Sequence, residues 1–344
     1  MNVTNLTTNT ILEFYPTNNL AELFAMLEEL RFKVSDFFWE RLSIVFAIIS
    51  VIGNCFIIAV LGKKGEKLSS TSIFILSLAL ADLFVSGYFI EGFLVSNDYI
   101  LGAYSTFDCK FRRSFQILGR NASPLTLCLI SVERVFCVVI PHKVKNIFTR
   151  KVAFFLLLAV WSISLAFISL YAFNYIFVIT SLGNHLCVIP YSEKYISVTY
   201  RISSIMGFVL KNGTWLINVI CMIIITRTLI QNVVVRGGKS VKTPVKSVTL
   251  SLLTVNAVYI LFMTPIVLYD GYVMAFMEKE LNLFEFYNHI NVHNILQFLS
   301  NINNVLNIFI YFLLGAKFRK DSKEFLLSFK LLQICCLPKA QKDC

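Results

Sequence analysis

Apolar residues dominate seven stretches of the chain, and each stretch is long enough to cross a lipid bilayer as a helix. A bilayer core of about 30 Å takes about 20 helical residues. Stretches such as 152–170 are apolar on every side of a helix, so they lack the polar face that a soluble helical protein requires. The seven predicted spans lie near residues 40–62, 72–95, 108–140, 152–175, 197–230, 246–276 and 289–314.

Charged residues in the connections between these spans alternate in sign. Lysine and arginine gather after spans one, three, five and seven, whereas acidic residues gather in the amino-terminal segment and the other connections. Because cytosolic connections are enriched in basic residues, this pattern predicts a plasma-membrane protein with an extracellular amino terminus and a cytosolic carboxyl terminus. The 57% hydrophobic content and the net charge of +11 then indicate a cytosolic face that attracts anionic lipid, rather than a surface that binds nucleic acid.

The chain is therefore predicted to be an all-α membrane protein, a seven-transmembrane helix bundle with a short amphipathic helix after the last span. We expect an extracellular, glycosylated amino terminus at 1–39, the bundle at 40–315, and a cytoplasmic amphipathic helix and tail at 316–344. The first 39 residues lack a basic stretch followed by an apolar core, so the first span would serve as the insertion signal. Asn2 and Asn5 each begin an N-x-[ST] glycosylation sequon.

The nine cysteines divide by their predicted side of the membrane. Cys109, at the start of the third span, and Cys187, in the loop after the fourth, are the two on the outer side, where oxidising conditions favour a disulfide bond. Cys335 and Cys336 follow the amphipathic segment and suit reversible palmitoylation, with plain reduced thiols as the alternative. The other cysteines fit small apolar packing residues.

One carboxylate, Asp82, lies in the middle of the second span, where ionisable groups are costly and usually functional. Counting depth at about 1.5 Å per residue places four neutral polar side chains at a similar level. This oxygen-rich set suits a small hard cation such as sodium, or a water cluster. The alternative is an interhelical hydrogen-bond network around a protonated Asp82. The four side chains are those of Asn54, Ser123, Asn303 and Asn307.

A glutamate and an arginine stand side by side in an otherwise apolar run, Ile130 to Pro141, at the cytosolic end of the third span. Burying either charge without a partner is costly, so Glu133 and Arg134 are expected to pair with each other. A static ion pair is one interpretation, although buried pairs seldom add net stability. A pair that opens during function is the other.

With these motifs in view, the chain resembles the rhodopsin-like (class A) G-protein-coupled receptors over about residues 40–330. Each motif is weak alone, but their order and spacing together are specific. Cys109 stands 25 positions before Arg134, for example, as the bridge cysteine and the switch arginine do in that family. The carrying motifs are Gly53-Asn54, Leu78-Ala79-Leu80-Ala81-Asp82, Cys109, Glu133-Arg134, Trp161, Cys187, Phe262-Met263-Thr264-Pro265, Asn307-Ile308-Phe309-Ile310-Tyr311 and Phe318-Arg319.

The resemblance implies how such a protein signals. Glu133-Arg134-Val135 matches the acid-Arg-Tyr switch, in which the acid holds the arginine at rest. On activation the sixth helix swings outward and the arginine meets a helix of a heterotrimeric G protein. The resemblance gives Tyr311 a part in this switch and makes Met263 and Pro265 the activation hinge.

Several positions depart from the family pattern and indicate a divergent member. The acidic partner that some members carry at the foot of span six would fall at Val245, so that lock is missing, and we expect raised basal activity. The other departures are Val135 and Cys221 in place of tyrosines, Met263 in place of a tryptophan, and Gly213 and Ile308 in place of prolines.

The ligand site implied by the resemblance lies in the outer half of spans three, five, six and seven. Gln116 stands where amine receptors carry an aspartate, and span seven has no lysine for a retinal Schiff base, so both ligand types are disfavoured. Arg120 lies deep in span three, where a guanidinium binds either a ligand anion or an internal partner such as Glu91. The predicted ligand is a peptide, with an acidic small molecule or lipid as the alternative. The candidate ligand-binding residues are Arg112, Gln116, Arg120, Lys211, Asp270, His293 and Gln297.

Two other classes of function compete with a receptor. A transporter or channel would favour pseudo-symmetric halves with broken helices, and the sequence shows none. A membrane-embedded enzyme would need metal-ligand spacing or a nucleophile–base pair, and the four scattered histidines supply neither. We therefore expect no enzyme and no cofactor. The expected partners are a heterotrimeric G protein, an extracellular ligand and membrane lipid.

Overall fold

The computed structural model describes residues 41–65, 68–96, 105–172, 176–179, 185–188, 198–235, 244–276 and 283–336. Seven helices in this part of the chain are long and apolar enough to cross a membrane, which confirms the predicted bundle. They are α3 (Ser43–Gly62), α4 (Ser70–Ser96), α5 (Thr106–Val139), α7 (Arg150–Ala172), α8 (Val198–Val235), α9 (Pro244–Phe276) and α10 (Leu283–Leu314).

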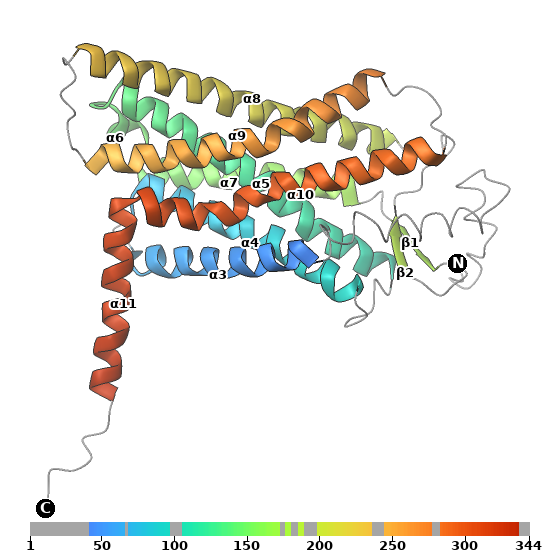
Figure 1. Cartoon of the computed structure of the whole chain (residues 1–344), viewed down its shortest axis with the longest axis horizontal. Coiled ribbons are helices and arrows are strands. Elements are labelled where there is room, and N and C mark those ends of the chain that lie inside the picture. Colours follow the sequence, from blue (N-terminus) through green and yellow to red (C-terminus); the bar gives the residue numbers. More distant parts are fainter. Residues whose placement is uncertain are drawn as a thin grey trace, which may run out of the picture.

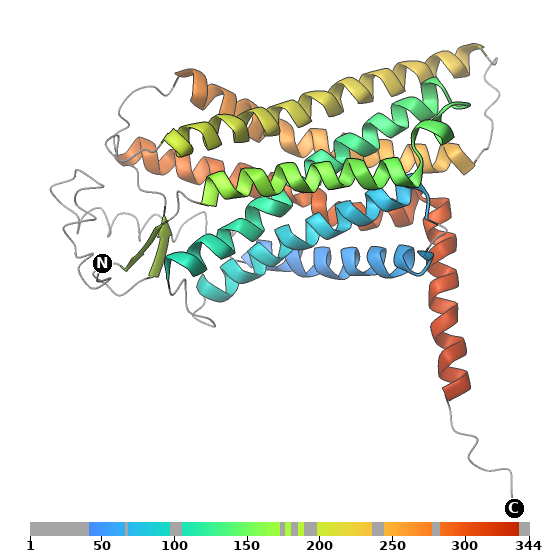
Figure 2. The ribbon, with the colours of Figure 1, turned by 180° about the vertical axis from the view of Figure 1, so that it is seen from behind.

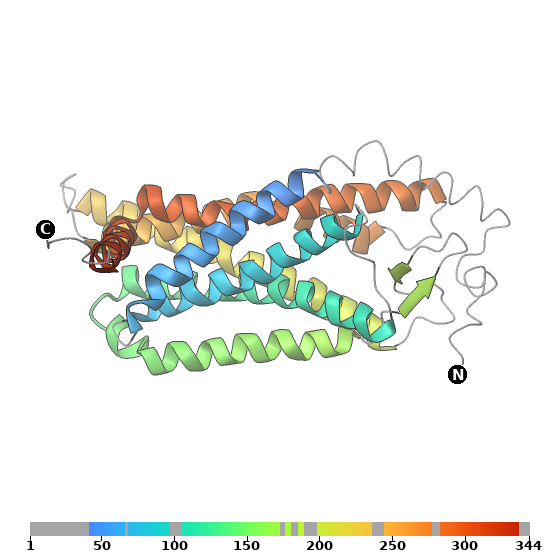
Figure 3. The same cartoon turned by 90° about the horizontal axis from the view of Figure 1, so that it is seen from below.

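The seven helices run side by side along the long axis of the molecule (Figure 1). Helix α5 lies at the centre and packs against α4, α7, α8 and α9, while α10 packs against α3 and α9 (Figure 3). The lipid-facing sides keep large apolar residues at the surface. Phe154 of α7 is 64% exposed and Leu261 of α9 is 67% exposed. Such exposure would be unfavourable in water and is expected against lipid tails.

Glycine brings neighbouring helices into close contact at two places. A Cβ atom at Gly119 of α5 would lie 2.6 Å from the backbone oxygen of Ala81 in α4. A Cβ atom at Gly53 of α3 would lie 2.7 Å from Cγ2 of Ile308 in α10. Small residues at helix contacts let membrane helices approach closely, because dispersion rather than the hydrophobic effect holds them together.

A short hairpin lies at one end of the bundle and was not predicted from the sequence. Strands β1 (Ile176–Ile179) and β2 (His185–Val188) pair antiparallel, with Phe177 opposite Cys187. Strand β1 packs against α5. Cys109, in the first turn of α5, is buried and disulfide-bonded. The side chain of Cys187 lies outside the described residues, so the pairing of the two cysteines stays a prediction.

At the opposite end, helix α11 (Ala316–Cys336) leaves the bundle at a steep angle to the other helices (Figures 1 and 2). The turn is stabilised by Arg319, whose Nη1 donates to the backbone oxygens of Phe312 at 3.1 Å and Leu313 at 2.7 Å. Lys64 also pairs with Asp321 of α11. The helix predicted after the last span is thus confirmed. The side chains of Cys335 and Cys336, and all of residues 1–40 with Asn2 and Asn5, lie outside the described part.

A four-residue helix, α6 (Val144–Ile147), follows α5 at this same end. Helix α4 begins at this end of the bundle, and helices α5 and α10 end at it. The predicted switch residues occupy this end of the bundle, whereas the predicted ligand residues occupy the end near the hairpin.

Candidate functional site

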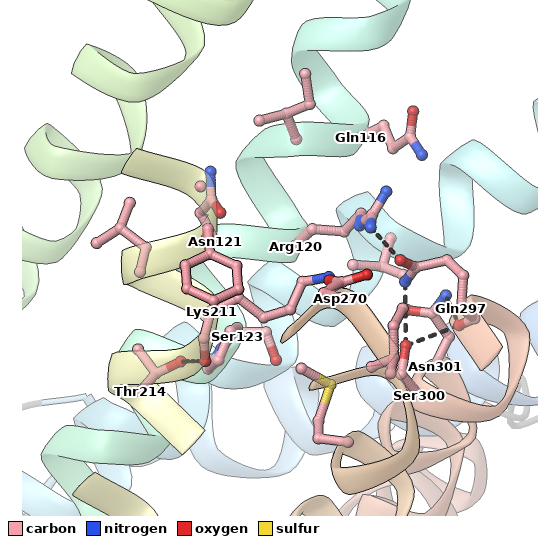
Figure 4. A pocket seen from close by; sticks show the side chains of 18 of the residues that line it. Gln116, Arg120, Asn121, Ser123, Lys211, Thr214, Asp270, Gln297, Ser300 and Asn301 are labelled. Carbon is pink, nitrogen blue, oxygen red and sulfur yellow. Dashed lines mark hydrogen bonds and ion pairs between the residues drawn. The ribbon is translucent and has the colours of Figure 1, made fainter. Parts of the chain in front are cut away.

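A cavity of about 480 Å³ lies among α5, α8, α9 and α10, in the half of the bundle that carries the hairpin. Its walls come from the first half of α8, the middle of α10 and the second half of α9, with α5 crossing between them. Six of the seven predicted ligand residues line it, and Figure 4 shows most of them around the space. They are Gln116, Arg120, Lys211, Asp270, His293 and Gln297.

Asp270 joins three helices across the cavity. The Lys211 ammonium of α8 pairs with its carboxylate, and His293 Nδ1 of α10 lies 3.5 Å from Asp270 Oδ1. One turn before His293, His289 Nδ1 lies 2.8 Å from the hydroxyl of Tyr269. The charged groups of the cavity wall therefore hold α8, α9 and α10 in one arrangement.

Arg112 and Arg120, the two arginines among the predicted ligand residues, have different surroundings on α5. Arg120 donates a hydrogen bond to Gln297 Oε1 across the cavity (Figure 4). Arg112 instead donates to Glu91 Oε1 at 2.9 Å and to Asp108 Oδ1 at 3.0 Å, and it does not line the cavity. Arg120 thus has an internal partner, one of the two alternatives expected, but the suggested partner Glu91 is wrong. Glu91 lies beside the hairpin end of α5, two turns away from Arg120, and it pairs with Arg112 there.

Asp82 is fully buried at the centre of the bundle and accepts two hydrogen bonds. Ser123 Oγ donates to Asp82 Oδ1 at 2.8 Å, and Asn307 Nδ2 donates to Asp82 Oδ2 at 2.8 Å. Both contacts join residues of different helices that the sequence analysis placed at the same depth. The carboxylate of α4 thus connects α5 with α10.

The other two residues of the predicted cluster bind elsewhere. Asn54 Nδ2 donates to the backbone oxygen of Ser50 at 2.9 Å and approaches that of Asn304 at 3.4 Å. Asn303 Nδ2 donates to Asn304 Oδ1 at 3.0 Å. The five predicted residues therefore form two adjoining groups, rather than one shell around Asp82. Ser123 and Asn307 bind Asp82, whereas Asn54 and Asn303 both contact Asn304.

The chemistry of this region fits a hard cation or water. The side-chain oxygens of Asn54, Asn303 and Asn307 are buried and have no donor among the described residues. Hard cations prefer such oxygen ligands, and a buried amide oxygen without a partner is unfavourable. The part of the chain that the structure describes holds no group of three histidine, cysteine, aspartate or glutamate residues that could bind a metal. The ligands that this region offers to a cation are therefore the side-chain oxygens around Asp82.

At the end of the bundle that carries α11, the predicted switch residues are paired. Arg134 Nη2 lies 2.9 Å from Glu133 Oε2, and both side chains are buried. Thr71 of α4 joins the pair, because its hydroxyl accepts from Arg134 Nη2 and lies 2.9 Å from Glu133 Oε2. Ser70 also donates to Glu133 Oε1. The sequence did not identify these two hydroxyl residues, since a serine and a threonine at a helix start carry no specific signal.

The remaining predicted switch and hinge residues lie on α9 and α10. Tyr311 is buried against Phe318, and its hydroxyl has no partner in the described part of the chain. Met263 lines the cavity, and Pro265 lies two residues after Met263 inside α9. Trp215 Nε1 of α8 donates to Thr264 Oγ1 of α9 at 3.1 Å, a contact that the sequence did not suggest.

A second polar group between α5, α8 and α9 was also missed. Asn218 accepts from Ser131 Oγ at 2.7 Å, donates to Cys128 Sγ at 3.1 Å, and offers its backbone oxygen to Asn256 Nδ2 at 3.3 Å. All of these side chains are buried. Asn218 and Asn256 could have indicated this group from the sequence, because amides are rare inside apolar spans unless they bind across helices.

Comparison with known proteins agrees with this architecture. The family model described as "7 transmembrane receptor (rhodopsin family)" matches residues 53–311. The C-C chemokine receptor type 4 of Homo sapiens is 27% identical over 309 residues, which cover 86% of this chain and 79% of that receptor. Shorter alignments reach galanin receptor 2b of Danio rerio (28% over 181 residues, 49% of this chain and 45% of that one) and the D(1C) dopamine receptor of Xenopus laevis (28% over 125 residues, 34% and 25%).

Proposed function

The chain belongs to the rhodopsin family of seven-transmembrane receptors, and we propose that it converts the binding of an extracellular ligand into activation of a heterotrimeric G protein. Two features at opposite ends of the bundle support this proposal. One is the polar cavity near the hairpin, and the other is the buried pair of Glu133 and Arg134. With the basic connections in the cytosol, the cavity faces the outside and the pair faces the G protein. The plasma membrane is the proposed location.

The observation that carries the proposal is the set of partners around Arg134. Its described partners, Glu133 and Thr71, come from α5 and α4, and among the described side chains none on α9 hydrogen-bonds to it. Helix α9 can therefore move outward without breaking this cluster. Arg134 becomes available to a G-protein segment only when its bond to Glu133 opens, so the pair is a switch with two states.

Helix α9 connects the cavity with this end of the bundle. Met263 lines the cavity, and Pro265 interrupts the backbone hydrogen bonds two residues further along. A helix bends most easily at such an interruption. A ligand that changes the packing of Met263 would thus act beside the hinge, and the bend would shift the cytosolic half of α9.

Asp82 would tune the same equilibrium. Asp82, Ser123 and Asn307 are the residues that would hold a sodium ion, which would neutralise the buried carboxylate and favour the resting arrangement. Their hydrogen bonds already join α4, α5 and α10, so the loss of the ion would loosen three helices together. The neighbouring unpartnered amide oxygens support a cation or water at this level.

A peptide is the first choice of ligand. The cavity offers both charge signs through Arg120, Lys211 and Asp270, and a neutral Gln116 stands where amine receptors carry their anchor. Relatives named for a chemokine and for galanin support this choice, although a relative named for dopamine aligns as well. An acidic small molecule or lipid is the second candidate, and the surroundings of Arg120 favour it.

A nucleotide-exchange measurement tests the proposal. Membranes from cells that express the receptor would be screened with a peptide library, with GTPγS binding to the G protein as the readout. A stimulated signal that disappears in Arg134→Gln supports a receptor. Ion flux without any G protein would instead support a channel or transporter, and an unchanged signal in Arg134→Gln would contradict the proposed switch.

A further inference from the structure

We propose that the cavity binds a carboxylate group of its ligand at Arg120, and that this carboxylate displaces Gln297. The inference rests on the proposed function, because it takes the cavity to be the ligand site. It adds the chemical class of the ligand and names the contact that changes on binding. Four observations lead to it.

The first observation is that Arg120 has no acidic partner among the described residues. Its one described hydrogen bond goes to the neutral amide oxygen of Gln297. Two carboxylates on the neighbouring helices are engaged with other bases, Glu91 with Arg112 and Asp270 with Lys211. A partly buried guanidinium paired only with an amide lacks the charge-assisted bonds that would offset its loss of hydration.

The second observation is the charge of the cavity wall. Three arginine and lysine side chains, Arg113, Arg120 and Lys211, line the cavity beside two histidines, whereas Asp270 is the one carboxylate among its described lining residues. Arg120 and Lys211 are close enough for their charges to repel. An anion bound between them would remove this repulsion, so the cavity favours a negatively charged group.

The third observation is geometric. A guanidinium presents five N–H donors in a planar fork, and the bond to Gln297 uses a single Nη2 donor. A carboxylate matches this fork with two parallel hydrogen bonds, which an amide oxygen cannot do. Figure 4 shows Arg120 and Lys211 directed toward the same region, where Gln297 and Asp270 also lie. The carboxylate would therefore replace the Gln297 oxygen on Arg120 with Lys211 nearby.

The fourth observation is where Gln297 leads. Its Nε2 donates to Ser300 Oγ at 3.0 Å, and its backbone oxygen accepts from Asn301 Nδ2 at 2.8 Å. Asn307, further along α10, holds Asp82. Release of Gln297 from Arg120 would thus uncouple α5 from α10 at the cavity. Helix α10 is also the helix that contacts the buried carboxylate of Asp82. Gln297 is a positioning residue in this account, and Arg120 is the binding residue.

The test uses the full-length receptor in lipid nanodiscs and measures its thermal unfolding midpoint. The probes are benzoate, octanoate and N-acetyl-phenylalanine, each with its uncharged amide as the matched control. We expect the acids to raise the midpoint by about 3 °C or more at saturation, and the amides to leave it unchanged. The three acids distinguish an aromatic acid, a lipid-like acid and a peptide carboxyl terminus as the source of the group.

Variants then assign the effect to Arg120. Arg120→Gln should abolish the response to every acid, whereas Arg227→Gln, an exposed arginine near the other end of α8, should keep it. Gln297→Ala should lower the acid concentration for half of the shift several-fold, because it removes the competing partner. This last variant keeps the inference testable if Arg120→Gln does not fold.

Each outcome bears on one of the two proposals. Equal shifts with amides, no shift with any acid, or an unchanged response in Arg120→Gln would overturn the carboxylate site. Basal GTPγS exchange, measured on the same variants, reports on the receptor function independently of acid binding. Acid-dependent shifts without any exchange would contradict the receptor function while supporting the site.

Discussion

Arg134 and Glu133 are neighbours in the sequence, yet their side chains meet, with Nη2 of the arginine 2.9 Å from Oε2 of the glutamate. Consecutive residues on a helix point in different directions, so such a contact needs a third group to hold it. Thr71 of α4 is that group, because its hydroxyl accepts from the arginine and donates to the glutamate. The pair is therefore held by groups from two helices, rather than by the ion pair alone.

We predict that Thr71→Val raises ligand-independent nucleotide exchange. The substitution keeps the shape of the side chain and removes the hydroxyl that joins the pair, at a cost of about 1 kcal/mol in the stability of the resting state. A cost of that size corresponds to a several-fold rise in the population of the open switch. GTPγS binding to a G protein in receptor membranes measures it.

The matched control is Thr254→Val. Thr254 Oγ1 donates only to the backbone oxygen of Leu250 in its own helix, so exchange should stay at the wild-type rate. If both valine variants give wild-type exchange, Thr71 does not hold the switch.

Tyr311→Phe should leave the resting receptor as stable as the wild type or more stable. The Tyr311 hydroxyl is buried without a described partner, and an unpartnered buried hydroxyl costs about 1–3 kcal/mol. If this hydroxyl finds its partner in the active state, stimulated exchange should fall while the thermal midpoint rises or stays level. A lower midpoint would mean that the hydroxyl is already engaged at rest.

Gly119→Ala should destabilise the bundle. The added Cβ would lie 2.6 Å from the backbone oxygen of Ala81, and backbone atoms cannot move aside without separating α4 from α5. We expect a loss of about 1–3 kcal/mol, seen as a lower unfolding midpoint in detergent. Gly213→Ala is the control, since nothing lies within 4 Å of its added Cβ and alanine favours a helix. Equal midpoints for the two variants would contradict the close contact.

Sodium should stabilise the receptor through Asp82. Unfolding midpoints would be compared in sodium chloride and choline chloride at equal ionic strength, and we expect the higher midpoint in sodium. Asp82→Asn should remove the difference, because the amide no longer offers a charged ligand. A sodium effect of wild-type size in Asp82→Asn would place the ion elsewhere.

The spans and their depth were predictable because membrane insertion leaves a strong mark on the sequence. Apolar runs of about 20 residues defined the helices, and counting residues along them placed Ser123 and Asn307 level with Asp82. Both indeed bind that carboxylate. The family motifs then gave the switch pair its position at the end of α5.

The partners of individual polar groups were not predictable in the same way. Arg112 and Arg120 lie eight residues apart on α5, and which of them reaches Glu91 depends on how α4 and α5 cross. Asn54 lay at the expected depth, but its amide binds its own helix and the backbone of Asn304. The depth of a polar residue in the membrane follows from the apolar run around it. Its hydrogen-bond partner depends on the angles at which the helices pack, which no short stretch of the sequence specifies.

The most direct test of the account compares ligand-free GTPγS exchange in membranes that carry wild-type receptor, Glu133→Gln, Arg134→Gln, or no receptor. With no acid at position 245 to hold Arg134, wild-type exchange should exceed that of receptor-free membranes. Glu133→Gln should raise it further by freeing the arginine, and Arg134→Gln should return it to background. Exchange at the receptor-free level in both wild type and Glu133→Gln, or undiminished exchange in Arg134→Gln, would contradict a switch built on this pair.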